Sequence, residues 1–200
     1  MTRWYVEKKR EHYYKQAKKQ GYRARSAYKL KQIQKKFNII SKDDIVVDLG
    51  AAPGGWSQVA KEIVGDDGHV FGIDLLPIKP LEGVEFLKGD MTEEGSINLL
   101  KELLNGSFAD VVISDMSPDI SGTYSIDQAR SVFLCEQAFI ATEHFLKDNG
   151  NFICKIFEGE DLDSFYNKIS KKFSFVKRFN PNASRKSSSE IYIIAKGFKK

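Results

Sequence analysis

Short runs of apolar residues alternate with amphipathic stretches along most of the chain. The apolar runs predict strands near 45–49, 69–74, 84–88, 110–115, 150–157, 174–180 and 190–196. The stretches between them predict helices near 55–64, 93–104, 126–147 and 161–171. Most of the strands are continuous apolar runs rather than alternating ones, so we expect both faces of the sheet to be covered.

Two further helices are predicted before the first strand. The first has helical composition from about Trp4 to Lys19 and is closed by Gly21, and the second is capped by Ser26 and runs to about Phe37. The last two strands have no clear helix between them, which predicts a hairpin that adds an antiparallel edge strand. We therefore expect an α/β fold, a Rossmann-like doubly wound sheet of about seven strands, mostly parallel, with N-terminal helices.

Length and composition are consistent with a single domain. The chain has 200 residues, of which 42% are hydrophobic, and a domain takes roughly 100–200 residues. We expect residues 1–200 to form one domain, with 1–42 as a basic helical appendage and 43–200 as the core. No run reaches the roughly 18 apolar residues of a membrane span, and charge follows Met1, so a cytoplasmic protein is expected. The two cysteines, Cys135 and Cys154, lack metal-ligand spacing, so no metal site is predicted.

Positive charge is concentrated at the two ends of the chain. Residues 1–42 contain 14 Lys and Arg against two acidic residues, and residues 164–200 contain 10 against one, whereas residues 43–163 are strongly acidic. Aromatic residues lie between the positive charges, and such rings can stack on unpaired bases. We interpret the basic ends as an RNA-binding surface, with a purely solubilising role as the alternative.

A glycine-rich turn follows the first predicted strand, in the segment Asp48–Trp56. A strand that ends in glycines and continues as a helix delivers a small-molecule ligand to the carboxyl edge of a parallel sheet. Gly50, Gly54 and Gly55 allow tight turns and a close approach of the backbone to a ligand. The segment has neither the Gly-Lys-Ser/Thr ending of a phosphate-binding loop nor the dinucleotide glycine spacing. The carboxylate of Asp48 favours a positively charged ligand instead.

Acidic residues follow four of the strands in turn. Asp74 ends the second strand, where a carboxylate can accept hydrogen bonds from two ribose hydroxyls. Asp90 follows the third strand, within reach of an adenine edge, and Asp115 ends the fourth. Each of them alone is most often a helix cap or a turn former. Together with Asp48 they favour a ligand-binding edge.

Two further charged residues lie at predicted strand positions. Lys155 interrupts an apolar strand, although lysine is almost never buried unless paired. The functional hypothesis is that its amine points into the crevice near Asp115, and snorkelling from a strand end is the alternative. Glu190 opens the last strand among basic residues, where a surface ion pair is the alternative. Composition alone does not single out Lys29.

Five segments of the chain closely resemble the FtsJ-like (RrmJ) family of S-adenosylmethionine-dependent RNA 2′-O-ribose methyltransferases. The matching stretches are 21–30, 48–58, 114–118, 155–159 and 184–192, in family order over nearly the whole chain. The resemblance places the family's Lys-Asp-Lys-Glu catalytic tetrad on Lys29, Asp115, Lys155 and Glu190. It places cofactor-binding positions on Gly54, Trp56, Asp74, Asp90 and Asp115, to which the loop analysis adds Asp48 and Gly50.

The resemblance implies a methyl transfer to an RNA ribose with S-adenosylmethionine as cofactor. The implied substrate is a uridine in the A-loop of large-subunit (23S) ribosomal RNA, with transfer-RNA anticodon loops and messenger-RNA caps as alternatives. Lys155 is expected to accept the 2′-hydroxyl proton or to stay charged and stabilise the alkoxide. One compact domain makes a monomer the default expectation. The predicted RNA contacts include Arg23, Arg25, Arg185 and Lys186.

Two rival functions can be weighed against these residues. Tyr192 and Lys196 match the Tyr-x-x-x-Lys pattern of short-chain dehydrogenases. In a strand, however, positions four apart lie roughly 13 Å from each other instead of on adjacent helical turns. A non-catalytic RNA-binding or ribosome-assembly factor is the second rival, and it would have no need for Lys155 buried beside Asp115.

Overall fold

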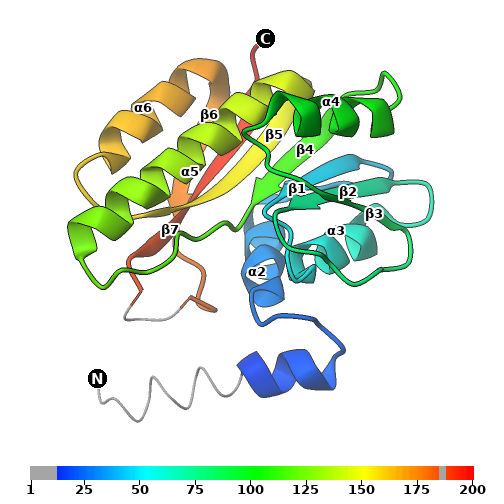
Figure 1. Ribbon diagram of the computed structural model, residues 1–200, viewed down its shortest axis with the longest axis horizontal. Coiled ribbons are helices and arrows are strands. Elements are labelled where there is room, and N and C mark those ends of the chain that lie inside the picture. Colours follow the sequence, from blue (N-terminus) through cyan, green and yellow to red (C-terminus); the bar gives the residue numbers. More distant parts are fainter. Residues whose placement is uncertain (1–12, 185–187) are drawn as a thin grey trace.

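A single mixed sheet lies between two layers of helices (Figure 1). The computed structural model describes residues 13–184 and 188–200, and within them the sheet has seven strands in the order β3-β2-β1-β4-β5-β7-β6. This arrangement confirms the predicted α/β fold. The strands are β1 (Ile45–Leu49), β2 (His69–Asp74), β3 (Val84–Lys88), β4 (Ala109–Ser114), β5 (Leu146–Phe157), β6 (Phe173–Phe179) and β7 (Glu190–Phe198).

The direction of each strand determines whether its amino end or its carboxyl end lies at a given edge of the sheet. Strands β1 to β5 pair in parallel, whereas β7 is antiparallel to both β5 and β6. The predicted hairpin is therefore confirmed, but its antiparallel strand β7 lies inside the sheet and β6 forms the edge. The more completely buried β7 occupies the inner position, while four of the seven residues of β6 are exposed. As a result, the amino end of β7 lies beside the carboxyl ends of β4 and β5.

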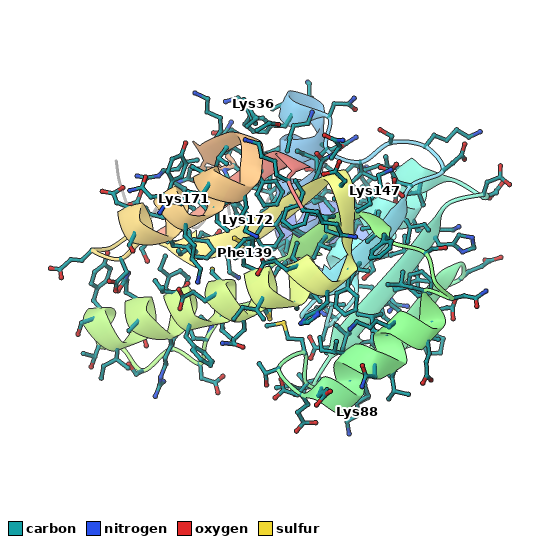
Figure 2. All side chains as sticks on the ribbon, turned by 90° about the horizontal axis from the view of Figure 1, so that it is seen from above. Lys36, Lys88, Phe139, Lys147, Lys171 and Lys172 are labelled. Atoms are coloured by element: carbon teal, nitrogen blue, oxygen red, sulfur yellow. The ribbon has the colours of Figure 1, made fainter. Side chains whose placement is uncertain are left out.

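Helices cover both faces of the sheet and create two hydrophobic cores. On one face lie α4 (Glu94–Leu103), α5 (Tyr124–Phe145) and α6 (Leu162–Lys172), and on the other lie α2 (Ala27–Phe37) and α3 (Gly55–Val64) (Figure 1). Seen from above in Figure 2, Phe139 extends from α5 towards the sheet, where its ring packs near Phe152 of β5. Each face is thus closed by its own set of helices.

The alternation of side chains along a strand assigns each residue to one of these two cores. In β5, Phe152 and Cys154 belong to the core under α5 and α6, whereas Ile153 belongs to the core under α2 and α3. Lys155 therefore points to the α2 and α3 face. Tyr192 belongs to the same core, and the two residues are direct partners across the β5–β7 ladder.

Many boundaries differ from the sequence-based expectation by one or two residues, and the start of β5 differs by four. Strand β5 begins at Leu146, so α5 ends two residues before the predicted end at position 147. The reason is an irregularity in the ladder: the β4–β5 register shifts between Ala109 and Val111, and Asn149 has a positive φ of 63°. The first predicted helix is present over residues 13–19, and its earlier part lies outside the described residues. No helix in the described part of the chain is long and apolar enough to cross a bilayer.

Substitution of Phe152 measures how much the core under α5 and α6 contributes to stability. Its side chain is fully buried and stacks on Phe173. Replacing Phe152 with Ala removes these contacts and leaves a cavity, so we expect a loss of about 3–5 kcal/mol in the free energy of unfolding. Denaturant unfolding measures this loss, with Phe133→Ala on the exposed side of α5 as the control, where the change should stay within roughly 0.5 kcal/mol. Equal losses in the two variants would contradict this account of the core.

Candidate active site

Two lysines and two carboxylates converge at the edge of the sheet on the α2 and α3 face. Lys29 Nζ of α2 lies 2.6 Å from Glu190 Oε1 at the start of β7. Lys155 Nζ of β5 lies 3.2 Å from Asp115 Oδ1, directly after β4. The two pairs adjoin each other, because Lys29 Nζ is 4.0 Å from Asp115 Oδ1. The structure thus brings together the four residues for which the sequence predicted a catalytic role.

The cluster is largely shielded from water. Lys29 and Lys155 are 5% and 6% exposed, although lysines are rarely buried unless paired. Lys155 Nζ also donates to the backbone carbonyl of Asp115 at 2.7 Å. The hydroxyl of Tyr192 donates to Asp115 Oδ1 at 2.6 Å. Asp115 therefore accepts from both Lys155 and Tyr192.

Burial and charge act in opposite directions on Glu190. Burial raises the pKa of Glu190, but the charge and hydrogen bond of Lys29 outweigh it, and the net pKa is lowered. The carboxyl group is therefore held in its ionised form, which is the partner that a buried ammonium group requires.

The glycine-rich turn approaches this cluster from β1. Gly50 has a φ of +73°, and a Cβ on it would lie 2.1 Å from Met116 Cγ, next to Asp115 in the chain. Gly54 has a φ of +100° and precedes the first residue of α3. Side chains at either position would be strained. The turn therefore needs glycine both for its backbone conformation and, at Gly50, for close packing.

A small cavity joins the turn to the cluster. Its volume is about 30 Å³, so its enclosed part admits only one end of a ligand of the size that usually fills pockets of roughly 300 Å³ or more. The cavity connects cofactor positions predicted on β1 and α3 with a residue of the charged cluster. Its lining includes Asp48, Gly50, Trp56 and Asp115.

Asp48 is the most deeply buried acid of this edge. It is 1% exposed and accepts a hydrogen bond from the Ser57 hydroxyl at 2.6 Å. Burial, helped by the negative charges of Asp115 and Asp74 and opposed by the Ser57 hydrogen bond, raises the pKa of Asp48 to about 7. A positively charged ligand in the cavity would stabilise the ionised form of this carboxyl group.

The other two predicted cofactor acids lie along the same edge, outside the cavity lining. Asp74 ends β2, and its two oxygens accept from the backbone N–H groups of Ala52 and Leu76. Asp90 follows β3 and accepts from the N–H and hydroxyl of Thr92. The surrounding loops hold both carboxylates in place, and their roles towards a cofactor stay predictions.

The residues predicted to contact RNA are described only in part. Arg23 donates from its guanidinium group to the carbonyls of Lys79 and Pro80, and a Cβ on Gly54 would lie 2.9 Å from Arg23 Nη1. This contact attaches the segment before α2 to the loop after β2. Arg25 is partly exposed, and its positive charge acts on the Tyr192 hydroxyl, which indicates that it lies near the cluster. Residues 185 and 186 lie outside the described residues.

Two residues that contact the site were not among those predicted from the sequence. Ser57 binds Asp48 from the first turn of α3. Tyr192 was considered only as part of a dehydrogenase pattern, yet it lies two positions after Glu190 on β7 and therefore on the same face of the strand. The period of two along β7 is the signal that could have identified it.

Together, the strand order, the glycine-rich turn after β1 and the carboxylate-lined edge define an S-adenosylmethionine-dependent methyltransferase fold. A model of the FtsJ-like methyltransferase family matches residues 22–198. The chain belongs to this family, whose members use S-adenosylmethionine.

Known proteins support this assignment. A Halorubrum lacusprofundi protein named ribosomal RNA large subunit methyltransferase E is 52% identical over 190 residues, covering 94% of this chain and 71% of that protein. A Methanocaldococcus jannaschii protein of the same name is 50% identical over 200 residues, covering 98% and 82%. A solved structure from Plasmodium falciparum, described as a candidate ribosomal RNA methyltransferase, has a TM-score of 0.80 at 28% identity and covers 88% of this chain and 98% of its own.

The residues at the turn fit the cofactor chemically. The methyl donor carries a positive sulfonium, and the cavity is lined by the carboxylates of Asp48 and Asp115. The close packing at Gly50 also leaves no room there for a side chain that would fill the turn. In the described residues, no group of three or more His, Cys, Asp and Glu side chains could hold a metal ion.

Asp48 makes the stability of the cofactor-free protein depend on pH. Its folded-state pKa of about 7 exceeds the ordinary value of 3.8, so the folded protein retains a proton that the unfolded chain releases. As pH rises from the ordinary pKa of 3.8 to the folded-state pKa of about 7 and beyond, the free energy of unfolding therefore falls, by roughly 4 kcal/mol in total. Replacing Asp48 with Asn should therefore raise the unfolding temperature at pH 8 and have little effect near pH 4.

Thermal unfolding at the two pH values measures the difference. Asp67→Asn, at an exposed position in the turn before β2, is the control and should change stability equally at both. A gain for Asp48→Asn that does not depend on pH would contradict the proposed titration.

Proposed function

We propose that this protein methylates the ribose 2′-oxygen of a nucleotide in large-subunit (23S) ribosomal RNA, with a uridine of the A-loop as the expected target. The buried cluster of Lys29, Asp115, Lys155 and Glu190 carries the proposal, because it adjoins the cofactor cavity through Asp115. The names of the relatives that are about half identical over nearly the whole chain support the substrate. A monomer remains the expected state.

Lys155 is proposed to hold the reacting hydroxyl. An ammonium group has three hydrogens to donate, and two of the directions at Lys155 Nζ are taken by the carbonyl and the Oδ1 atom of Asp115. The third can bind the 2′-oxygen and stabilise the negative charge that develops on it. The oxygen bonds to the methyl carbon as the carbon–sulfur bond breaks, and the hydroxyl proton is released to solvent water. Asp115 Oδ1, at 3.2 Å, is the kind of partner that an ammonium group needs in a shielded position. The geometry therefore favours the cation role over the general-base role.

The remaining cluster residues orient Lys155 and the substrate. Glu190 and Lys29 form a short ion pair beside Asp115, so they restrict the positions that the carboxylate can adopt. S-adenosylmethionine supplies the methyl group, which it carries on a positively charged sulfur. The residues proposed to bind this cofactor are Asp48, Gly50, Gly54, Trp56, Asp74, Asp90 and Asp115. Because in-line attack demands a narrow range of geometries, fixing the hydroxyl is a large part of the rate enhancement.

Residues 1–42, together with Arg185 and Lys186 in the segment before β7, are proposed to bind RNA. Arg25 supports this proposal, because its positive charge acts on the Tyr192 hydroxyl beside the charged cluster. Arg23 is proposed to act in the same surface, in addition to its contacts with the loop after β2. The proposed contacts of Arg185 and Lys186 rest on the charge pattern alone.

A methyl-transfer assay tests the function directly. The purified protein is incubated with labelled S-adenosylmethionine and with large ribosomal subunits, bulk transfer RNA or capped messenger RNA. We expect label on ribosomal RNA, mapped to a ribose. Labelling of transfer RNA alone would keep the chemistry and overturn the substrate, and tight RNA binding without transfer would favour a non-catalytic factor.

Replacing Lys155 with Ala should abolish most of the transfer. The 2′-oxygen loses its cationic donor, so we expect the rate to fall by about 100- to 1000-fold, while cofactor affinity measured by calorimetry changes little. The control is Lys168→Ala, which removes a surface ion pair with Glu136. Less than a tenfold loss of rate in the Lys155 variant would exclude the proposed role. A wild-type rate that depends on the titration of a single basic group between pH 6 and 10 would favour the general-base role instead.

Replacing Arg25 with Ala should weaken RNA binding without affecting the cofactor. If the guanidinium group contacts one phosphate, the slope of log affinity against log salt concentration should decrease by about one. Filter binding across a salt series gives this slope. Lys101→Ala, at an exposed position on α4 and on the face of the sheet away from α2, is the matched control. An unchanged slope in the Arg25 variant would place the RNA surface elsewhere.

A further inference from the structure

Tyr192 is a buried polar side chain that the tetrad does not include. It has no exposed surface, and its hydroxyl donates to Asp115 Oδ1 at 2.6 Å. Burial raises the pKa of Tyr192 well above its ordinary value, and the negative charges of Asp115 and Glu190 raise it further. The hydroxyl is therefore protonated at working pH and acts as a hydrogen-bond donor.

The ring of Tyr192 is fixed by its neighbours. It stacks on Trp56 with ring centres 5.7 Å apart and an interplanar angle of 27°. The Trp56 indole N–H donates to the carbonyl of Ser26, directly before α2. Lys29 Nζ of α2 lies 5.7 Å from the centre of the Tyr192 ring. The hydroxyl therefore approaches Asp115 from a direction that α2, α3 and β7 determine together.

The same oxygen of Asp115 receives the contacts of Tyr192 and both lysines. Oδ1 lies 3.2 Å from Lys155 Nζ and 4.0 Å from Lys29 Nζ. A carboxylate can rotate about its bond to Cβ, and the Tyr192 hydrogen bond adds to the restriction that the lysines impose on this rotation. A neutral donor at 2.6 Å holds Oδ1 between the lysines without adding a charge to the cluster.

We propose that Tyr192 is a positioning residue for the methyl transfer, which acts through Asp115 to keep Lys155 aimed at the 2′-oxygen. This proposal rests on the proposed function. The hydroxyl fixes the Asp115 carboxylate, the carboxylate and its backbone carbonyl hold Lys155 Nζ, and the remaining direction of Nζ is left for the substrate.

Replacing Tyr192 with Phe removes only the hydroxyl and keeps the ring on Trp56. A hydrogen bond to a charged group corresponds to about a tenfold or greater change in rate, so we expect kcat to fall at least tenfold while KM for S-adenosylmethionine and RNA stays within about threefold. The matched control is Tyr166→Phe, which removes a hydroxyl that donates to the Val176 carbonyl on the other side of the sheet. It should leave kcat unchanged.

A double-variant comparison separates action through Asp115 from a general structural effect. In an Asp115→Asn background the Tyr192 hydroxyl has lost its carboxylate, so Tyr192→Phe should reduce single-turnover rates by less than about twofold further. If the two losses multiply in full, Tyr192 acts independently of Asp115 and the proposal is wrong. It is also wrong if Tyr192→Phe and Tyr166→Phe have the same kcat as the wild type.

A measurement without substrate keeps this proposal separate from the proposed function. The ¹³Cγ resonance of Asp115, assigned by its loss in Asp115→Asn, should shift in Tyr192→Phe and stay in place in Tyr166→Phe. An unshifted resonance in Tyr192→Phe would overturn the positioning role. Absence of methyl transfer by the wild type, together with the expected shift, would overturn the function and leave the hydrogen bond to Asp115 established.

Discussion

The mutual compensation of three buried charges and one partly buried charge is the constraint on which the site depends. Burying one ammonium or carboxylate group costs several kcal/mol unless an opposite charge and hydrogen bonds replace water. Here two lysines and two carboxylates lie within ion-pair distance of one another. Because each comes from a different element, the cluster is complete only when α2, β4, β5 and β7 are all in place. The charges therefore couple the geometry of the site to that of the whole sheet.

The antiparallel direction of β7 makes this convergence possible. In a parallel sheet the carboxyl ends of the strands meet at one edge, and this edge brings Asp115 and Lys155 together. A strand in the opposite direction contributes its amino end to the same edge, so Glu190 begins β7 beside Phe157, the last residue of β5. Two residues further on, Tyr192 lies opposite Lys155. One reversal of direction therefore supplies both an acid and a hydrogen-bond donor to an edge formed by parallel strands.

Apolar runs predicted the strands to within a few residues, because a strand covered on both faces has little freedom in its composition. The antiparallel hairpin was predicted as well, but apolar runs alone did not indicate that β6 forms the edge and β7 the inner strand. In the site, the position of Lys155 in an apolar strand was informative, whereas Lys29 looks like any other lysine of a basic helix. Only the resemblance to a family selected it. Tyr192 was not predicted as a site residue, because its hydrogen-bond partner Asp115 is 77 residues away in the sequence.

The two halves of the site are balanced differently in charge. Around Asp115, lysines compensate the carboxylates, so that half is ready for a neutral hydroxyl and needs no further ion. Asp48 has a neutral hydroxyl as its hydrogen-bond partner, and the nearby Asp115 and Asp74 add negative charge, which together with burial holds its pKa at about 7. A cationic ligand supplies the missing charge on that side. The same edge of the sheet can therefore select a positively charged methyl donor at β1 and a neutral acceptor between β4 and β7, because burial makes each local imbalance of charge costly.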